Sequence, residues 1–184
     1  MTNTTLTTPA GAVVTLTALT TSEAVALQRF NRALSPGTRR RFLPHAYDSA
    51  TVAKIIARAE TGVDYTVVLL DGKQIVGYAF LWDVQDPVPV LGIGLADAFQ
   101  GKGLGQALMK HLIDVAREQR AEGIELTTLP DNDGAFALYL KMGFTYLGDT
   151  MNLAGDGRNV QERVMFLPLK ADAKPPVRQF GPPV

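Results

Sequence analysis

The chain has 184 residues and a formal net charge of zero, with 18 basic and 18 acidic residues. This length suits one domain with a sizeable core, and the balanced charge argues against a nucleic-acid binder, which normally carries a basic excess. The sequence lacks cysteine, which excludes disulfides, cysteine-based metal sites and a thiol nucleophile. Its two histidines, His45 and His111, are far apart in sequence, so we expect no bound metal.

The sequence also predicts where the protein resides and how it divides. No apolar run approaches the roughly 18 residues of a membrane span, and the N-terminus lacks the basic and apolar regions of a signal peptide. We therefore expect a cytoplasmic protein without a membrane partner. The predicted organisation is a flexible, threonine-rich segment over residues 1–11, one domain over 12–170, and a proline-rich tail over 171–184 that is a poor candidate for packed structure.

Hydrophobic periodicity predicts, in chain order, a strand, two helices, a hairpin and then alternating strands and helices. Ser35-Pro36-Gly37 ends the first helix, and a basic stretch follows it. Asp71-Gly72 between two β-branched runs is a strong hairpin signal. The predicted strands cover residues 13–19, 65–70, 73–82, 91–95, 124–129, 144–147 and 161–169, and the predicted helices begin near residues 24, 49, 104 and 132.

The most informative segment is a glycine loop between a strand and a helix. The apolar run 90–95 leads through Gln100-Gly101-Lys102-Gly103-Leu104-Gly105 into an amphipathic helix. The first N–H groups of a helix lack intrahelical partners, and the macrodipole adds roughly half a positive charge there. Glycines let the backbone approach a ligand closely. The segment therefore predicts a site for a phosphate or pyrophosphate.

Three loop patterns compete for this segment. The dinucleotide fingerprint G-x-G-x-x-G fails at its third glycine, where Gln106 stands, although Glu122 or Glu125 has the spacing of its acidic residue. No segment matches the P-loop pattern. The pattern [RQ]-x-x-G-x-[GA] fits residues 100–105 at every fixed position. In this respect the loop resembles the acyl-CoA loop of the GNAT superfamily of N-acetyltransferases.

A second motif supports the same resemblance. Residues 132–144 read N-x-x-A-x-x-L-Y-x-K-x-G-F, which is similar to the late helix and following strand of GNAT enzymes. The resemblance covers roughly residues 13–169 and implies that residues 12–170 form a GNAT acetyltransferase domain. The implied fold is α+β: a mixed, mostly antiparallel twisted sheet with flanking helices. In it a splayed parallel pair, 91–95 and 124–129, binds acyl-CoA.

The resemblance also implies a reaction and its residues. Acetyl-CoA is the implied co-substrate, no metal is needed, and a primary amine of a small molecule or protein attacks the thioester directly. Tyr139 occupies the general-acid position, and a phenol with a reference pKa of about 10 holds its proton better than a thiol of about 8.5. The implied cofactor-binding residues are Ile93, Gly94, Leu95, Gln100, Gly101, Lys102, Gly103, Leu104, Gly105 and Asn132.

The sequence leaves the general base open. GNAT enzymes often place a carboxylate on the strand before the glycine loop, but the strand at 88–94 contains no acid. An alkyl amine with a pKa of about 10.4 must nevertheless lose a proton before it attacks. The candidates are Asp86, Asp97, Glu125 and His45, or a water chain that ends at one of them. Asp86 could instead contact the substrate ammonium.

The acceptor site and the activity each allow two interpretations. Arg39, Arg40 and Arg41 could clamp an acidic acceptor or form a solvated helix face. Trp82 and Tyr78 could line the acceptor side or belong to the core. The protein could be an enzyme or a non-catalytic acyl-CoA sensor of the same fold. The expected partners are acetyl-CoA and an unidentified amine, and a homodimer stays open.

Overall fold

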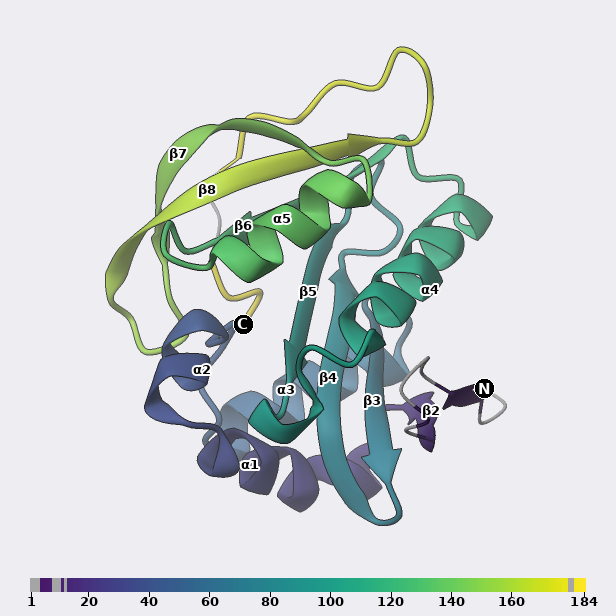
Figure 1. Ribbon diagram of the computed structural model, residues 1–184, viewed down its shortest axis with the longest axis vertical. Coiled ribbons are helices and arrows are strands. Elements are labelled where there is room, and N and C mark those ends of the chain that lie inside the picture. The colour runs from purple at the N-terminus through teal and green to yellow at the C-terminus, as the bar shows by residue number, and fades with distance from the viewer. Residues whose placement is uncertain (1–3, 8–10, 12, 179–180) are drawn as a thin grey trace.

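A single mixed sheet crosses the molecule, with helices on both of its faces (Figure 1). The computed structural model describes residues 4–7, 11, 13–178 and 181–184. Within these residues the sheet has eight strands in the order β1-β2-β3-β4-β5-β6-β8-β7. The strands are β1 (Thr4–Thr7), β2 (Val13–Ala18), β3 (Tyr65–Asp71), β4 (Gln74–Trp82), β5 (Val90–Leu95), β6 (Gly123–Thr128), β7 (Thr145–Leu153) and β8 (Asn159–Pro168).

Two of the helices, α2 (Pro36–Arg41) and α3 (Ser49–Glu60), begin at residues whose side chains cap their free N–H groups. Asp48 accepts hydrogen bonds from the N–H groups of Ala50 and Thr51, and Ser35 caps the helix that starts at Pro36.

No helix in the described ranges combines the length and the apolar character needed to cross a bilayer. The helices are α1 (Ala24–Ala33), α2 (Pro36–Arg41), α3 (Ser49–Glu60), α4 (Leu104–Glu118) and α5 (Asp133–Lys141).

Two apolar cores lie on opposite faces of the sheet. The larger core packs β-strand side chains such as Leu81 against Leu108 and Leu112 of α4. The other core packs Tyr78 and its neighbours against α1 and α3. Residues 78–82 of β4 are all buried and contribute alternately to both cores, as expected because successive side chains of a strand point to opposite faces. In Figure 1, α4 and α5 lie in front of the sheet and α3 lies behind it.

The predicted splayed parallel pair is confirmed. β5 pairs with β4 in antiparallel register along its whole length, from Val90 to Leu95. On its other side β5 meets β6 in parallel at one register pair, Val90 opposite Glu125. Beyond that pair the strands separate, so the edge of β5 over residues 91–95 has no strand partner on the β6 side.

Two expectations for the first part of the chain need correction. The sequence predicts a loose segment over residues 1–11, but residues 4–7 form β1 and pair antiparallel with β2. β-branched threonines favour this edge position, and residues 1–3 and 8–10 lie outside the described part. The basic stretch, which is not among the predicted helix starts, lies in the short helix α2, because Ser35 caps it and Pro36 suits its first turn.

The C-terminal tail also differs from expectation. Residues 171–178 and 181–184 form no helix or strand, yet part of this tail packs against the domain. The Arg178 guanidinium donates to the carbonyl of Val88 at 2.5 Å and lies 3.1 Å from the Glu125 carboxylate. The prediction of an unpacked tail is therefore wrong at Arg178, because its long side chain reaches from the tail to the sheet.

Candidate active site

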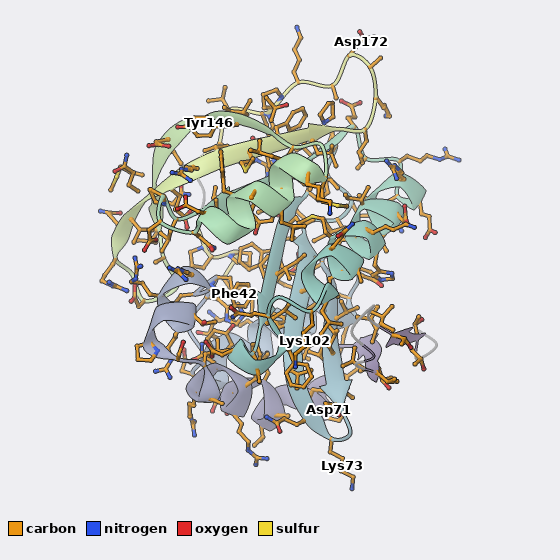
Figure 2. The ribbon with its side chains drawn as sticks, in the orientation of Figure 1. Phe42, Asp71, Lys73, Lys102, Tyr146 and Asp172 are labelled. Carbon is orange, nitrogen blue, oxygen red and sulfur yellow. The ribbon has the colours of Figure 1, made fainter. Side chains whose placement is uncertain are left out.

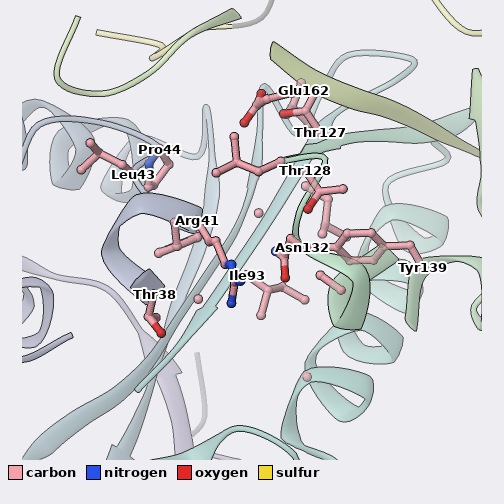
Figure 3. Close-up of a pocket in the computed structure, with 18 of the residues that line it drawn as sticks. Thr38, Arg41, Leu43, Pro44, Ile93, Thr127, Thr128, Asn132, Tyr139 and Glu162 are labelled. Atoms are coloured by element: carbon pink, nitrogen blue, oxygen red, sulfur yellow. The ribbon is translucent and has the colours of Figure 1, made fainter. Parts of the chain in front are cut away.

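A cleft of about 910 Å³ opens where β5 and β6 separate (Figure 3). Its wall includes Leu138 and Met109 of the helices on one face of the sheet, and Phe42 and Phe80 from the other face. The cleft therefore connects the two faces through the gap in the sheet. This geometry would let two ligands approach from opposite sides and meet between the strands.

The glycine loop forms one end of this cleft. Gly101 and Gly103 have φ values of +70° and +84°, in the left-handed region that favours glycine. Gly103 is the N-cap of α4, and no side chain caps this helix. The N–H groups over 101–105 have no hydrogen-bond acceptor among the described residues. A row of unpaired N–H groups at a helix N-terminus fits the diphosphate of coenzyme A.

The unpaired edge of β5 forms the cleft floor. Ile93, Gly94 and Leu95 all line the cleft, and their edge is free to bond amide groups of a ligand. A Cβ added at Gly94 would lie 2.2 Å from the ring of Phe42, and one at Gly92 would lie 2.1 Å from the ring of Phe80. Glycine at these positions therefore lets two aromatic rings pack directly on the strand and wall the cleft.

The other predicted cofactor residues take different positions. The Gln100 amide donates to the carbonyl of Leu95 at 3.0 Å and to Thr38 Oγ1 at 3.2 Å, so it braces the loop. Lys102, labelled in Figure 2, is exposed and lies over the Phe99 ring at 5.4 Å, and it is not among the residues that line the cleft. The Leu104 side chain is fully buried in the core, so only its backbone can face a ligand. Gly105 and Asn132 line the cleft, and no side-chain hydrogen bond ties Asn132 to the start of α5.

Tyr139 of α5 reaches the gap between the strands. Its side chain is 8% exposed and lines the cleft. Its hydroxyl makes no hydrogen bond within the described part of the chain. Burial, and to a lesser degree the charge of Glu162, raises the pKa of Tyr139 to about 12. The phenol therefore stays protonated at neutral pH and can donate.

Two of the base candidates have structural roles. Asp97 accepts hydrogen bonds from the Ser35 N–H at 2.9 Å and from the Thr38 hydroxyl at 2.6 Å. These bonds lower the pKa of Asp97 to about 2, which makes it a weak base. His45 is fully buried, with Nε2 3.0 Å from the hydroxyl of Tyr78 and Nδ1 2.7 Å from the carbonyl of Ala46. Neither Asp97 nor His45 lines the cleft.

The remaining two candidates also lie outside the cleft lining. Asp86 belongs to the turn before β5. Glu125 of β6 is 1% exposed and faces Arg178, and burial raises the pKa of its carboxyl. The structure therefore brings none of the four sequence-derived candidates to the cleft.

A carboxylate that is absent from those four candidates lines the cleft instead. Glu162 of β8 accepts a hydrogen bond from the Asn152 amide at 2.5 Å. Strand alternation puts it on the same face as Val160 and Val164. An acid between two valines of one strand face is the signal in the sequence that could have indicated it.

The arginines of α2 have partners in the structure. Arg40 forms an ion pair with Asp131, and Arg41 lies 3.9 Å from the same carboxylate. Arg39 donates to carbonyl groups of α1 and its C-cap. Because Arg40 and Arg41 line the cleft, they join α2 to the loop before α5 across it. Tyr78 is fully buried in the core, whereas Trp82 stacks on Phe80 at 4.1 Å and reaches the cleft wall.

Comparison with known proteins identifies the family of this chain. The sequence model of the acetyltransferase (GNAT) family matches residues 27–144, and the chain belongs to this family. N-alpha-acetyltransferase RimI of Mycobacterium tuberculosis is 37% identical over 81 residues, 42% of this chain and 49% of that protein. The uncharacterized protein YxbD of Bacillus subtilis is 32% identical over 111 residues, 60% of this chain and 67% of that protein. The chain thus spans about half the length of the mycobacterial relative.

Solved structures share the fold at low sequence identity. Ribosomal-protein-S5-alanine acetyltransferase from Vibrio fischeri superposes with a TM-score of 0.74 at 14% identity, over 94% of this chain and 100% of that one. YncA from Salmonella typhimurium, solved with its cofactor acetyl-CoA, superposes with a TM-score of 0.69 at 22% identity. The superposition covers 90% of this chain and 99% of that one. The expected α+β, GNAT-like fold is confirmed.

Proposed function

We propose that this protein is an N-acetyltransferase that transfers the acetyl group of acetyl-CoA to a primary amine. The observation that carries the proposal is the juxtaposition of three features at one cleft. Unpaired N–H groups over 101–105 lie at one end. The unpaired edge of β5 forms the floor, and the protonated hydroxyl of Tyr139 lies at the gap.

Each feature has a chemical task in this proposal. The loop N–H groups bind the diphosphate, and the helix dipole of α4 adds favourable charge. The β5 edge over 93–95 orients the pantetheine amides and offers an N–H donor to the developing oxyanion. Acetyl-CoA supplies the activated thioester. Tyr139 then gives its proton to the leaving thiolate, so no protein nucleophile is required.

The names of similar proteins suggest which acceptor amines to test first. The mycobacterial relative is named an N-alpha-acetyltransferase and the Vibrio structure a ribosomal-protein-alanine acetyltransferase. These names support testing α-amines of peptides first, followed by polyamines, amino acids, aminoglycosides and protein lysines. The cleft reaches both faces of the sheet, which suits an acceptor that enters opposite the cofactor.

The test is a thiol-release assay joined to thermal unfolding. Acetyl-CoA should raise the melting temperature, because a ligand that binds the native state stabilises it by mass action. At least one amine of the panel should release free CoA in proportion to acetylated amine. Stabilisation without release from any amine would favour the acyl-CoA sensor, and no stabilisation at all would overturn both functions.

A further inference from the structure

We propose that Glu162, held by Asn152, forms the subsite that binds the ammonium group of the acceptor and takes its proton. This inference rests on the proposed acetyl transfer and names the residue that receives the amine. Three observations support it: the direction in which Glu162 points, the charges that face it, and the atom that Asn152 leaves unpaired.

Glu162 points away from α5. Its neighbour Arg163 turns toward α5, where the guanidinium lies 4.6 Å from the centroid of the Phe136 ring. Because adjacent side chains of a strand point to opposite faces, Glu162 points to the other face of the sheet. Figure 3 shows Glu162 and Tyr139 entering the cleft from different elements. Glu162 therefore faces the acceptor side while its charge still acts on Tyr139 through the gap.

Glu162 lacks the cationic partner that the other acids of the cleft have. Each other Asp or Glu that lines the cleft has an arginine nitrogen within 4.0 Å, whereas Glu162 has no such partner among the described residues. A half-buried carboxylate without a counter-charge favours a cation brought by a ligand. The paired acids are Asp83 with Arg58, Asp131 with Arg40, and Asp133 with Arg163.

Asn152 orients this carboxylate and has an unused acceptor of its own. A carboxylate offers only acceptors, so the amide Nδ2 of Asn152 must face Glu162 and Oδ1 must face away. Asn152 is 3% exposed, and its Oδ1 is buried with no hydrogen-bond partner among the described residues. An unpaired buried acceptor costs free energy until a donor arrives. An ammonium group, with three donors, matches a subsite in which the Glu162 carboxylate and Asn152 Oδ1 both offer acceptors.

The proton balance of the reaction gives Glu162 a further task. At neutral pH an alkyl amine is almost wholly protonated. Glu162 takes one proton from the ammonium, which frees the lone pair of the amine nitrogen. The C–N bond forms and the C–S bond breaks as Tyr139 protonates the departing thiolate. The second proton on nitrogen then returns to the Tyr139 phenolate, and the proton on Glu162 leaves to solvent. The sum is amide, thiol and one released proton.

The test compares Glu162→Gln with Asp149→Asn. Asp149 is an exposed acid of β7 that bonds Tyr146 and Gln161 outside the cleft, so its variant controls for loss of one negative charge. With the most active amine of the panel, Glu162→Gln should lower kcat/KM at least 100-fold at pH 7. The deficit should shrink toward pH 10, where the free amine no longer needs a base. Affinity for acetyl-CoA, measured by calorimetry, should be unchanged.

A structural role for Glu162 would give a different result. An equal deficit at every pH, or kcat/KM equal to wild type, would overturn the proposal. Glu162→Asp, which keeps the charge on a shorter side chain, should recover part of the activity. If Glu162→Gln does not fold, Glu162→Asp is measured in its place. Its deficit in kcat/KM should also shrink toward pH 10, and a deficit that is equal at every pH would overturn the proposal.

A binding measurement separates this inference from the proposed function. Spermidine, kanamycin and an alanyl peptide amide are titrated into the CoA-bound protein, in which no transfer can occur. Binding of at least one probe to wild type, weakened tenfold or more in Glu162→Gln, supports the subsite even if no amine is acetylated. Equal binding to both proteins, or no binding of any probe to wild type, overturns it.

Discussion

The guanidinium of Arg178 and the carboxylate of Glu125 form an ion pair at the point where β5 and β6 begin to separate. Arg178 Nε lies 3.1 Å from Glu125 Oε2, and the side chain of Glu125 is only 2% exposed. Glu125 is also the residue of β6 that stands opposite Val90, the one register pair of the two strands. A side chain of the tail thus compensates a buried charge beside the point where the two strands separate.

Arg178→Met should destabilise the protein, because it leaves the Glu125 carboxylate buried and unpaired. Loss of one partner of a buried pair costs about 3 kcal/mol or more, so urea unfolding should report a loss of that size. The control Arg117→Met breaks an exposed pair with Asp114 and should change the free energy of unfolding by less than about 1 kcal/mol. Equal losses in the two variants would contradict a buried, compensated charge, and adding Glu125→Gln to Arg178→Met should restore stability.

Gly103→Glu should abolish acetyl-CoA binding, because it places a side chain and a negative charge where the N–H groups over 101–105 converge. The left-handed backbone of Gly103, with φ +84°, adds a strain of about 1–2 kcal/mol to any substitution. Gly62→Glu has a similar φ of +75° and no neighbouring atom within 4 Å of its Cβ, so it controls for strain. Calorimetric titration should find normal affinity in the control alone. Retained affinity in Gly103→Glu would mean that the diphosphate binds elsewhere.

Tyr139→Phe should lower turnover and leave acetyl-CoA affinity nearly intact. A general acid contributes about 10²–10⁴-fold to the rate, so kcat should fall within that range in the thiol-release assay. Stability should change little, because the Tyr139 hydroxyl has no hydrogen-bond partner in the described chain. The matched control is Tyr65→Phe, which removes a bond to His111 at 2.7 Å outside this cleft. An unchanged kcat in Tyr139→Phe would remove the acid role.

Folding should become less stable as the pH falls from about 6.5 to about 4, partly through His45. Burial is the main cause that lowers the pKa of His45 to about 4 in the folded protein, and the hydrogen bond to Ala46 and the charge of Asp48 only partly oppose it. Between these pH values the unfolded chain binds more protons than the folded chain, so the free energy of unfolding rises with pH. The full contribution is about 3 kcal/mol, present above pH 6.5 and lost below pH 4.

The comparison of His45→Gln with wild type isolates this contribution. Urea unfolding at pH 4.5 and 7.5 should show a smaller pH dependence in the variant, because the carboxylates titrate alike in both proteins. His111→Gln provides the control, since His111 is only partly buried, in contrast to His45. The same pH dependence in His45→Gln and wild type would contradict a neutral, buried His45.

Local patterns in the sequence were sufficient for the glycine loop, the family and the elements other than β1 and α2. Apolar spacing and caps such as Asp48 depend on neighbouring residues only, and the helix start at Gly103 follows from residues 100–105 alone. The hairpin at Asp71-Gly72, whose tip is labelled by Asp71 and Lys73 in Figure 2, is local for the same reason.

Contacts between distant segments were decided only by the tertiary structure. Whether a base candidate is free to act depends on packing. Asp97 is hydrogen-bonded to Ser35, 62 residues earlier in the chain, and His45 is hydrogen-bonded to Tyr78. The register of β8 brings Glu162 to the cleft, and the path of the tail brings Arg178 to Glu125. Burial and long-range hydrogen bonding determine which of several similar carboxylates is free to react, and neither property can be read from the identity of adjacent residues.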